Sequence, residues 1–424
     1  MTAPAIGYAA ALEQLAPREA VRLAALAEQH GFRGTLAGDA AQPFTPSQGE
    51  APFVWNVVSA LGAQTTGELG VGALAPTFRW HPALVAQASA TLASLYPGRH
   101  WLALGSGEAI SEHVVGGYWP EPAERINRLF EAVTIIKKLF ASGSAGRDVK
   151  HEGRWYQLES SRLWTSPEQP PPLLIATAGP VTARRAGQVA DGLLIDSVPY
   201  DKLGMLLQRF AEGAREAGRR GSAPQHALRL HLSWAPTDAE AMRNALGEWP
   251  QAGMRFAKSD IRSPYDLEQI AKLVRPDDFD ERMLISSDLD AHRANIQRYL
   301  DLGIERIHLH NRGLRPRGAA PPHPLSLRRA PSTGCARVLL MNPIAPFDAL
   351  FTAIPILLIV AAILGIVLII WVIYTIVWMG VRRGLEEYYG PGEYRGFTPP
   401  PARDVDESAR PVRDRRHRSG RLTR

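Results

Sequence analysis

Short apolar runs alternate with longer amphipathic segments through the first 311 residues, and this alternation limits the possible folds more than any other feature. Runs of strand length that each precede a helical segment are typical of parallel βα units. Eight such units predict an α/β fold, a TIM barrel with insertions, and a doubly wound open sheet is the alternative. The predicted strands cover residues 5–9, 33–37, 69–74, 101–104, 173–176, 191–195, 228–234 and 306–310.

Proline and glycine mark several boundaries of the intervening helices. Pro17 opens the first helix, and Gly31 lies just past its end. The third helix is expected from Pro82 to Leu95. Residues 149–158 predict an inserted hairpin or extended segment, and the prolines at 170–172 break the chain before the strand at 173–176.

The clearest junction between a strand and a helix lies at residues 101–113. A buried strand runs into Gly105-Ser106-Gly107, and Glu108 follows at once. Glycines permit a sharp turn and the close approach of a ligand to the backbone. Barrels place their chemistry at the carboxyl ends of the strands. Glu108 is therefore a candidate site residue, although a glutamate in a first helical turn is also favoured by the helix dipole alone.

Two other junctions carry weaker signals. Asp39 ends the second strand, but its position alone is equally typical of a turn or N-cap residue. The segment Ala176-Thr177-Ala178-Gly179-Pro180 leads from a strand into a helix. Backbone amides at a helix N-terminus can bind a phosphate, although an ordinary βα turn has the same composition.

Several stretches resemble, in order, the deazaflavin-dependent branch of the luciferase-like monooxygenase superfamily, and within it the group of F420-dependent glucose-6-phosphate dehydrogenases. The resemblance covers about residues 5–312 and implies a TIM barrel, usually dimeric. It also implies an oxidoreductase that transfers a hydride between coenzyme F420 and a small organic substrate, such as an alcohol, carbonyl or enone. The matching stretches are residues 13–19, 51–55, 76–82, 105–108, 162–164, 178–180 and 274–277.

The resemblance also assigns roles to individual residues. Asp39 and Glu108 would be catalytic: Asp39 would contact the deazaflavin ring, and Glu108 would protonate its pyrimidine edge. A non-proline cis peptide would join Gly72 and Ala73 behind the ring. Asp196 stands where the family usually has a neutral residue, which weakens the case for the contact at Ser197. The other coenzyme contacts would come from Ser106, Gly107, Ala176, Thr177, Ala178, Gly179, Pro180 and Ser197.

The sequence departs from the family pattern around the substrate. Where the pattern reads Asp-His-Phe-x-Pro-Trp, Ala40 takes the place of the basic histidine and Phe44 that of the tryptophan. Alanine cannot transfer a proton, so that role is vacant. In the predicted substrate pocket, formed by Phe44, Gln269 and Arg282, Arg282 matches an arginine of the phosphate site. Pro199 and Gln269 replace its two lysines. We therefore do not expect glucose 6-phosphate to be the substrate.

Two other functional classes stay open, and two are disfavoured. The chain could be an FMN-dependent monooxygenase, or a non-catalytic, membrane-tethered module that binds a coenzyme, which Ala40 would suit. The histidines lack the spacing of metal ligands, so no metal is expected. Residues 312–424 carry seventeen arginines against eight acidic residues, which leaves residues 1–311 slightly acidic and disfavours nucleic-acid binding.

The last quarter of the chain differs in composition from the predicted barrel of residues 1–312. Residues 313–340 predict a linker rich in proline and arginine, 341–383 a membrane segment and 384–424 a basic disordered tail. The apolar stretch 353–379 is long enough to span a lipid bilayer. No signal peptide precedes the first strand, so we expect a cytoplasmic barrel on a membrane-associated chain. A start-like Met341 raises the hypothesis that the final residues belong to a separate protein.

Overall fold

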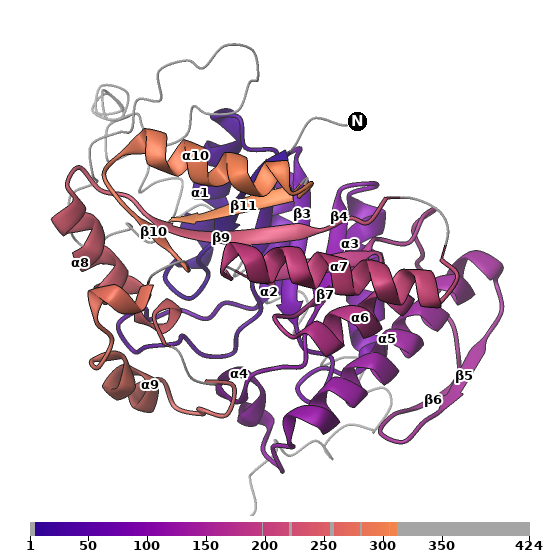
Figure 1. The fold of residues 1–424 in the computed structure, drawn as a ribbon. Helices are drawn as coiled ribbons and strands as arrows, with labels where there is room; N and C mark the ends of the chain where they lie inside the picture. The colour runs from indigo at the N-terminus through magenta and orange to yellow at the C-terminus, as the bar shows by residue number, and fades with distance from the viewer. Residues whose placement is uncertain are drawn as a thin grey trace, which may run out of the picture. The chain divides into compact units, whose positions relative to one another are not determined.

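The computed structural model describes residues 5–196, 198–219, 223–254, 258–279, 282–304 and 306–311. Within them, eight parallel strands close into a barrel (Figure 1). Strand β1 pairs with β2 on one side and β11 on the other, and a β8–β9 pairing completes the circle. This confirms the predicted TIM barrel and excludes the open sheet. The strands are β1 Ala5–Ala10, β2 Gly34–Ala37, β3 Glu68–Leu74, β4 His100–Leu104, β7 Leu173–Ala176, β8 Gly192–Asp196, β9 Ala227–Ser233 and β11 Arg306–Asn311.

Helices alternate with these strands and share an apolar core with their outward-facing side chains. The third helix has the predicted bounds, because proline fixes its start. The helices that follow single strands are α1 Pro17–Gln29, α2 Val54–Gln64, α3 Pro82–Leu95, α4 Ala109–Glu112, η1 His113–Val115, α5 Pro122–Ala145, α6 Pro180–Val189 and α7 Tyr200–Glu216. A longer excursion between β9 and β11 contains α8 Asp238–Glu248, η2 Pro250–Ala252, α9 Pro264–Ala271, η3 Pro276–Phe279, β10 Leu284–Ile285 and α10 Leu289–Asp301.

The predicted insertion before β7 is confirmed as an antiparallel hairpin of β5 Val149–Glu152 and β6 Gln157–Ser161. Glu131 of α5 anchors its turn, because its carboxylate accepts backbone N–H groups from Arg154, Trp155 and Tyr156. The hairpin projects to the side of α5 in Figure 1.

Large side chains fill the middle of the barrel, and small residues lie towards the carboxyl ends of its strands. Trp101 is 2% exposed and packs against the ring of His308, at 5.5 Å between centroids. The side chains of Leu36, Leu174 and Leu194 belong to the same inner cluster. Several strands carry alanine at or near their carboxyl ends, among them Ala37, Ala73 and Ala176.

The prediction of a membrane-associated chain is corrected by this structure. Among the described residues, no helix is both long and apolar enough to cross a bilayer. The longest, α5, has 24 residues but carries charged side chains along its length, because one face packs on the barrel and the other faces solvent. The predicted span at 353–379 lies outside the described residues, as do the linker and the tail.

Candidate active site at the barrel mouth

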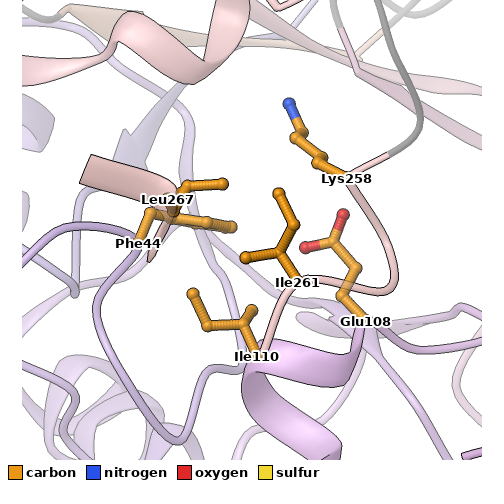
Figure 2. A pocket seen from close by; sticks show the side chains of 6 residues that line it. All are labelled: Phe44, Glu108, Ile110, Lys258, Ile261 and Leu267. Atoms are coloured by element: carbon orange, nitrogen blue, oxygen red, sulfur yellow. The ribbon is translucent and has the colours of Figure 1, made fainter. Parts of the chain in front are cut away.

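Glu108 lies at the carboxyl end of β4 and is the N-cap residue of α4. It borders a small cavity with Lys258 and four apolar residues, shown in Figure 2. In that view Glu108 and Lys258 occupy one side, and Phe44 and Leu267 the other. The sequence predicted Glu108 and Phe44 here but did not indicate Lys258. The apolar lining consists of Phe44, Ile110, Ile261 and Leu267.

A wall of small residues stands beside Glu108. The peptide bond between Gly72 and Ala73 is cis, as the resemblance implied. A Cβ added at Gly105 would lie 3.4 Å from the Cβ of Ala73 and 3.8 Å from that of Ala176. Three neighbouring strands, β3, β4 and β7, therefore come together with hardly any side-chain volume between them. A flat ring system could lie against this wall.

The turn before Glu108 requires glycine for two reasons. Gly107 has a φ of +87°, a conformation that residues with a side chain rarely adopt. A Cβ there would also lie 3.0 Å from Cγ of Glu112. Gly107 thus lets α4 fold back beneath Glu108. Ser106 is half-buried in the same turn, where its carbonyl accepts a hydrogen bond of 3.4 Å from the Thr77 hydroxyl.

Asp39 is almost fully enclosed at the end of β2. Its side chain is 2% exposed, and Oδ2 accepts hydrogen bonds from Arg79 Nη2 at 2.5 Å and Trp80 Nε1 at 2.9 Å. Burial raises the pKa of Asp39, although Arg79 and Trp80 offset part of this effect. The described contacts of this carboxylate are therefore with protein groups, and its contact with a coenzyme ring stays a prediction.

A second buried acid, Glu112, shares the same arginine. Glu112 Oε2 accepts the backbone N–H of Arg79 at 3.0 Å, and Oε1 lies 3.8 Å from Arg79 Nε. Burial raises the pKa of Glu112 to about 7, against the opposing effect of Arg79. Arg79 therefore lies between two carboxyl groups from different loops. Glu112 was not predicted from the sequence, although its position four residues after Glu108 on a short helix could have indicated it.

Contacts distant in sequence hold Lys258 next to the Glu108 turn. The Ser259 carbonyl accepts the N–H of Ala109 at 2.7 Å. Arg125 of α5 donates to Asp260 Oδ1 at 2.9 Å and to Ser259 Oγ at 3.2 Å, while Trp119 Nε1 donates to the same Asp260 oxygen at 2.8 Å. We call Arg125, Trp119, Ser259 and Asp260 the clasp. Because it spans more than 130 residues of sequence, no local pattern could predict it.

Gln42 joins a third loop to this arrangement. Its Nε2 donates to the carbonyl of Ile110 at 2.8 Å and to that of Arg262 at 3.3 Å. The loops that follow β2, β4 and β9 are therefore tied together around the cavity. Ala40, two residues before Gln42, offers no group for proton transfer.

An ion pair joins two neighbouring strands, β8 and β9, near the mouth. Arg229 of β9 pairs with the carboxylate of Asp196 at the end of β8, with Nη2 and Oδ2 2.7 Å apart. Burial disfavours the charge on Asp196, but the Arg229 guanidinium lowers its pKa overall. Nη1 of Arg229 lies 3.4 Å from where a Cβ of Gly38 would be, so the guanidinium extends from β9 towards β2. Ser197 lies outside the described residues.

The predicted phosphate segment forms a compact turn before α6. The Thr177 hydroxyl accepts the N–H of Gly179 at 3.0 Å. The helix begins at Pro180, and no side chain caps its N-terminus. Ala176 and Ala178 add little bulk beside this turn. The geometry suits an anion bound by backbone amides, and that role stays a prediction.

The predicted substrate residues are only partly brought together. Phe44 lines the cavity, whereas Gln269 is exposed on α9 and accepts a hydrogen bond from Lys272 at 2.9 Å. The reason is helical periodicity: Leu267 faces the cavity, and a residue two positions later points away from it. Arg282 donates to the Met254 carbonyl at 2.9 Å, and its charge contributes to lowering the pKa of Lys258.

Histidines are present inside the barrel but form no evident metal centre. His231 and His310 lie on adjacent strands with their Nδ1 atoms 3.0 Å apart, and Trp249 packs against both rings. Within the part of the chain that the structure describes, no three His, Cys, Asp or Glu side chains are placed to hold a metal ion.

Comparison with known proteins agrees with this geometry. Residues 2–306 match the profile of the luciferase-like monooxygenase family. The chain belongs to that family. Among the related members is the F420-dependent glucose-6-phosphate dehydrogenase of Microbacterium testaceum (strain StLB037). It is 35% identical over 317 residues, which cover 74% of this chain and 93% of the relative.

Two further members of the luciferase-like monooxygenase family are similar over the same region. F420-dependent glucose-6-phosphate dehydrogenase 1 of Rhodococcus jostii (strain RHA1) is 36% identical over 312 residues, or 72% of this chain and 92% of the relative. Among solved structures, an F420-dependent secondary alcohol dehydrogenase in complex with an F420-acetone adduct superposes with a TM-score of 0.68. Its sequence is 30% identical, and the match covers 73% of this chain and 94% of the other.

Proposed function

We propose that the chain is an F420-dependent oxidoreductase that transfers a hydride between the coenzyme and a small alcohol or carbonyl compound, or an enone. Relatives at 35–36% identity that are named as F420-dependent enzymes support the coenzyme. The structural observation that carries the proposal is the wall of Gly72, Ala73, Gly105 and Ala176 beside Glu108. A planar ring would fit against this surface, because its residues are small.

The residues present fit a deazaflavin. The small-residue wall would hold the ring, and the backbone amides that follow Thr177 would hold the phosphate of the tail. When bound, the coenzyme supplies a two-electron hydride acceptor or donor. Glu108 would hold a proton at its carboxyl oxygen and deliver it to the ring edge, since it is the acidic group that borders the cavity.

The cavity favours a substrate with apolar substituents. Its four apolar side chains outnumber its two charged ones. A related structure contains acetone joined to F420, which supports a small secondary alcohol or ketone as the substrate class. Gln269, which was expected to replace a phosphate-binding lysine, does not line the cavity, whereas Lys258 supplies a cation there. The apolar lining remains the reason to propose that a sugar phosphate is not the substrate.

Coenzyme titration of the purified full chain tests the proposal. We expect F420 to bind more tightly than FMN, as followed by fluorescence, and F420 to be reduced when short secondary alcohols are added. Preferential FMN binding would instead support a monooxygenase. F420 binding without turnover of any alcohol, ketone or enone would support the non-catalytic alternative.

A further inference from the structure

The oxidation of an alcohol releases a proton as well as a hydride, and the vacancy at Ala40 leaves that proton without an acceptor. The hydride leaves carbon with the electron pair of the C–H bond. The hydroxyl proton must pass to a base at or near neutral pH. Among the described residues that line the cavity, Glu108 and Lys258 are the ionisable ones. Glu108 is already assigned to the coenzyme edge, which leaves Lys258 for the substrate.

We propose, on the basis of the proposed function, that the amine of Lys258 exchanges the proton of the substrate oxygen. In oxidation, the substrate O–H bond breaks and an N–H bond forms on Lys258. The C–H bond breaks as its hydride leaves for the deazaflavin, and the C=O bond forms. The substrate loses two electrons and the coenzyme gains them. In carbonyl reduction, the ammonium of Lys258 returns the proton to the oxygen.

The position of Lys258 supports this role, because the clasp fixes the backbone on its C-terminal side. Ser259 and Asp260 are bonded to Ala109 and Arg125. Nζ of Lys258 donates to the Gln251 carbonyl at 2.8 Å. Lys258 is thus held at its backbone and at its amine, on the side of the cavity where Glu108 also lies (Figure 2).

The surroundings of Lys258 shift its ionisation towards the neutral amine. Burial is the main influence and lowers the pKa of Lys258, and the cations Arg282 and Arg229 act in the same direction. The carboxylates of Glu108 and Asp196 oppose them and favour the ammonium. A lowered pKa leaves a larger fraction of the amine neutral at a given pH, and only the neutral amine can accept a proton.

The first test measures the ionisation of Lys258 directly, in the full chain without coenzyme. Competitive acetylation across a pH series, with peptides quantified by mass spectrometry, gives the titration midpoint of each lysine. We expect Lys258 to titrate at lower pH than the exposed Lys272, and to move lower still in Glu108→Gln, which removes a favourable charge. Equal midpoints for Lys258 and Lys272 would overturn the proposal.

The second test separates proton transfer from binding. Lys258→Ala should lower turnover by roughly 10²–10⁴-fold, the usual range for one acid–base group. Small primary amines should restore part of it. Lys258→Arg should stay inactive, because a guanidinium keeps its proton. F420 titrations should match wild type in both variants, and Lys272→Ala is the matched control.

Different results would contradict the role of Lys258 and the proposed function of the chain. An active Lys258→Arg enzyme, or a Lys258→Ala enzyme changed only in KM, would make Lys258 a binding residue and overturn its role in proton transfer. A wild-type chain that binds F420 but oxidises no alcohol and reduces no carbonyl would overturn the proposed function, and the role of Lys258 with it.

Discussion

The protonation states of acidic side chains near the mouth depend on a few buried neighbours. Asp39 and Glu112 share Arg79, and each has a raised pKa because burial disfavours its ionised form. One guanidinium can neutralise one carboxylate, so the second group is more stable with a proton. Glu112, with a pKa of about 7, is the group expected to carry it at neutral pH.

This arrangement makes stability depend on pH. The pKa of Glu112 rises from 4.5 in the unfolded chain to about 7 in the fold, so the native state binds the proton more tightly. Its contribution to the free energy of unfolding is fully present below pH 4.5 and falls as pH rises to about 7, by about 3 kcal/mol in all. In Glu112→Gln that part of the slope should vanish, as urea unfolding at pH 5 and pH 8 would measure.

The control for this prediction is Glu159→Gln, at an exposed position on β6, which should retain the wild-type slope. A Glu112→Gln protein with the wild-type dependence on pH would mean that Glu112 ionises as freely in the fold as in the unfolded chain.

At the scale of elements, the loops after β2, β4 and β9 behave as one unit because hydrogen bonds join them around the cavity. The clasp is the part most open to test. Asp260 has a side chain 61% exposed, so its ion pair with Arg125 should add no more than about 1 kcal/mol to stability. The main effect of this ion pair is on position, because it fixes the segment that carries Lys258.

Asp260→Ala should therefore loosen the segment without unfolding the barrel. We expect faster hydrogen exchange at the Ala109 amide, which loses a steady partner in Ser259, together with a raised KM for substrate. Hydrogen exchange followed by mass spectrometry would measure the first effect. Asp266→Ala, at an exposed position on α9 of the same excursion, is the control and should leave both values unchanged. Wild-type exchange at Ala109 in the Asp260 variant would contradict the idea.

Local sequence patterns predicted these elements well but not the contacts between them. Strands appeared as apolar runs, and Pro82 marked the start of α3, because both signals lie within a few residues. Lys258 and Glu112 were missed because their partners come from other loops and only the folded barrel brings them together. The sequence did not show which side of α9 faces the cavity: Leu267 takes the inward position, whereas Gln269 is exposed.

At the scale of the whole molecule, the closed barrel determines where chemistry can occur. Eight of the described strands meet in a ring, and the inner cluster around Trp101 fills its centre. Near the amino ends of β3 and β11, Glu68 and Arg306 pair at 2.8 Å.

The homodimer implied by the resemblance and the domain boundaries beyond residue 312 stay predictions.

A coenzyme and a substrate that both enter through the barrel mouth would bind in a fixed order. A ring lying against Gly72 and Gly105 would occupy the inner position, and a substrate beside Phe44 and Leu267 would stand between it and the solvent. The coenzyme should then enter first and leave last. Product-inhibition kinetics would show this as competition between the reduced and oxidised coenzyme for the empty protein, with the organic product competing only for the coenzyme-loaded form.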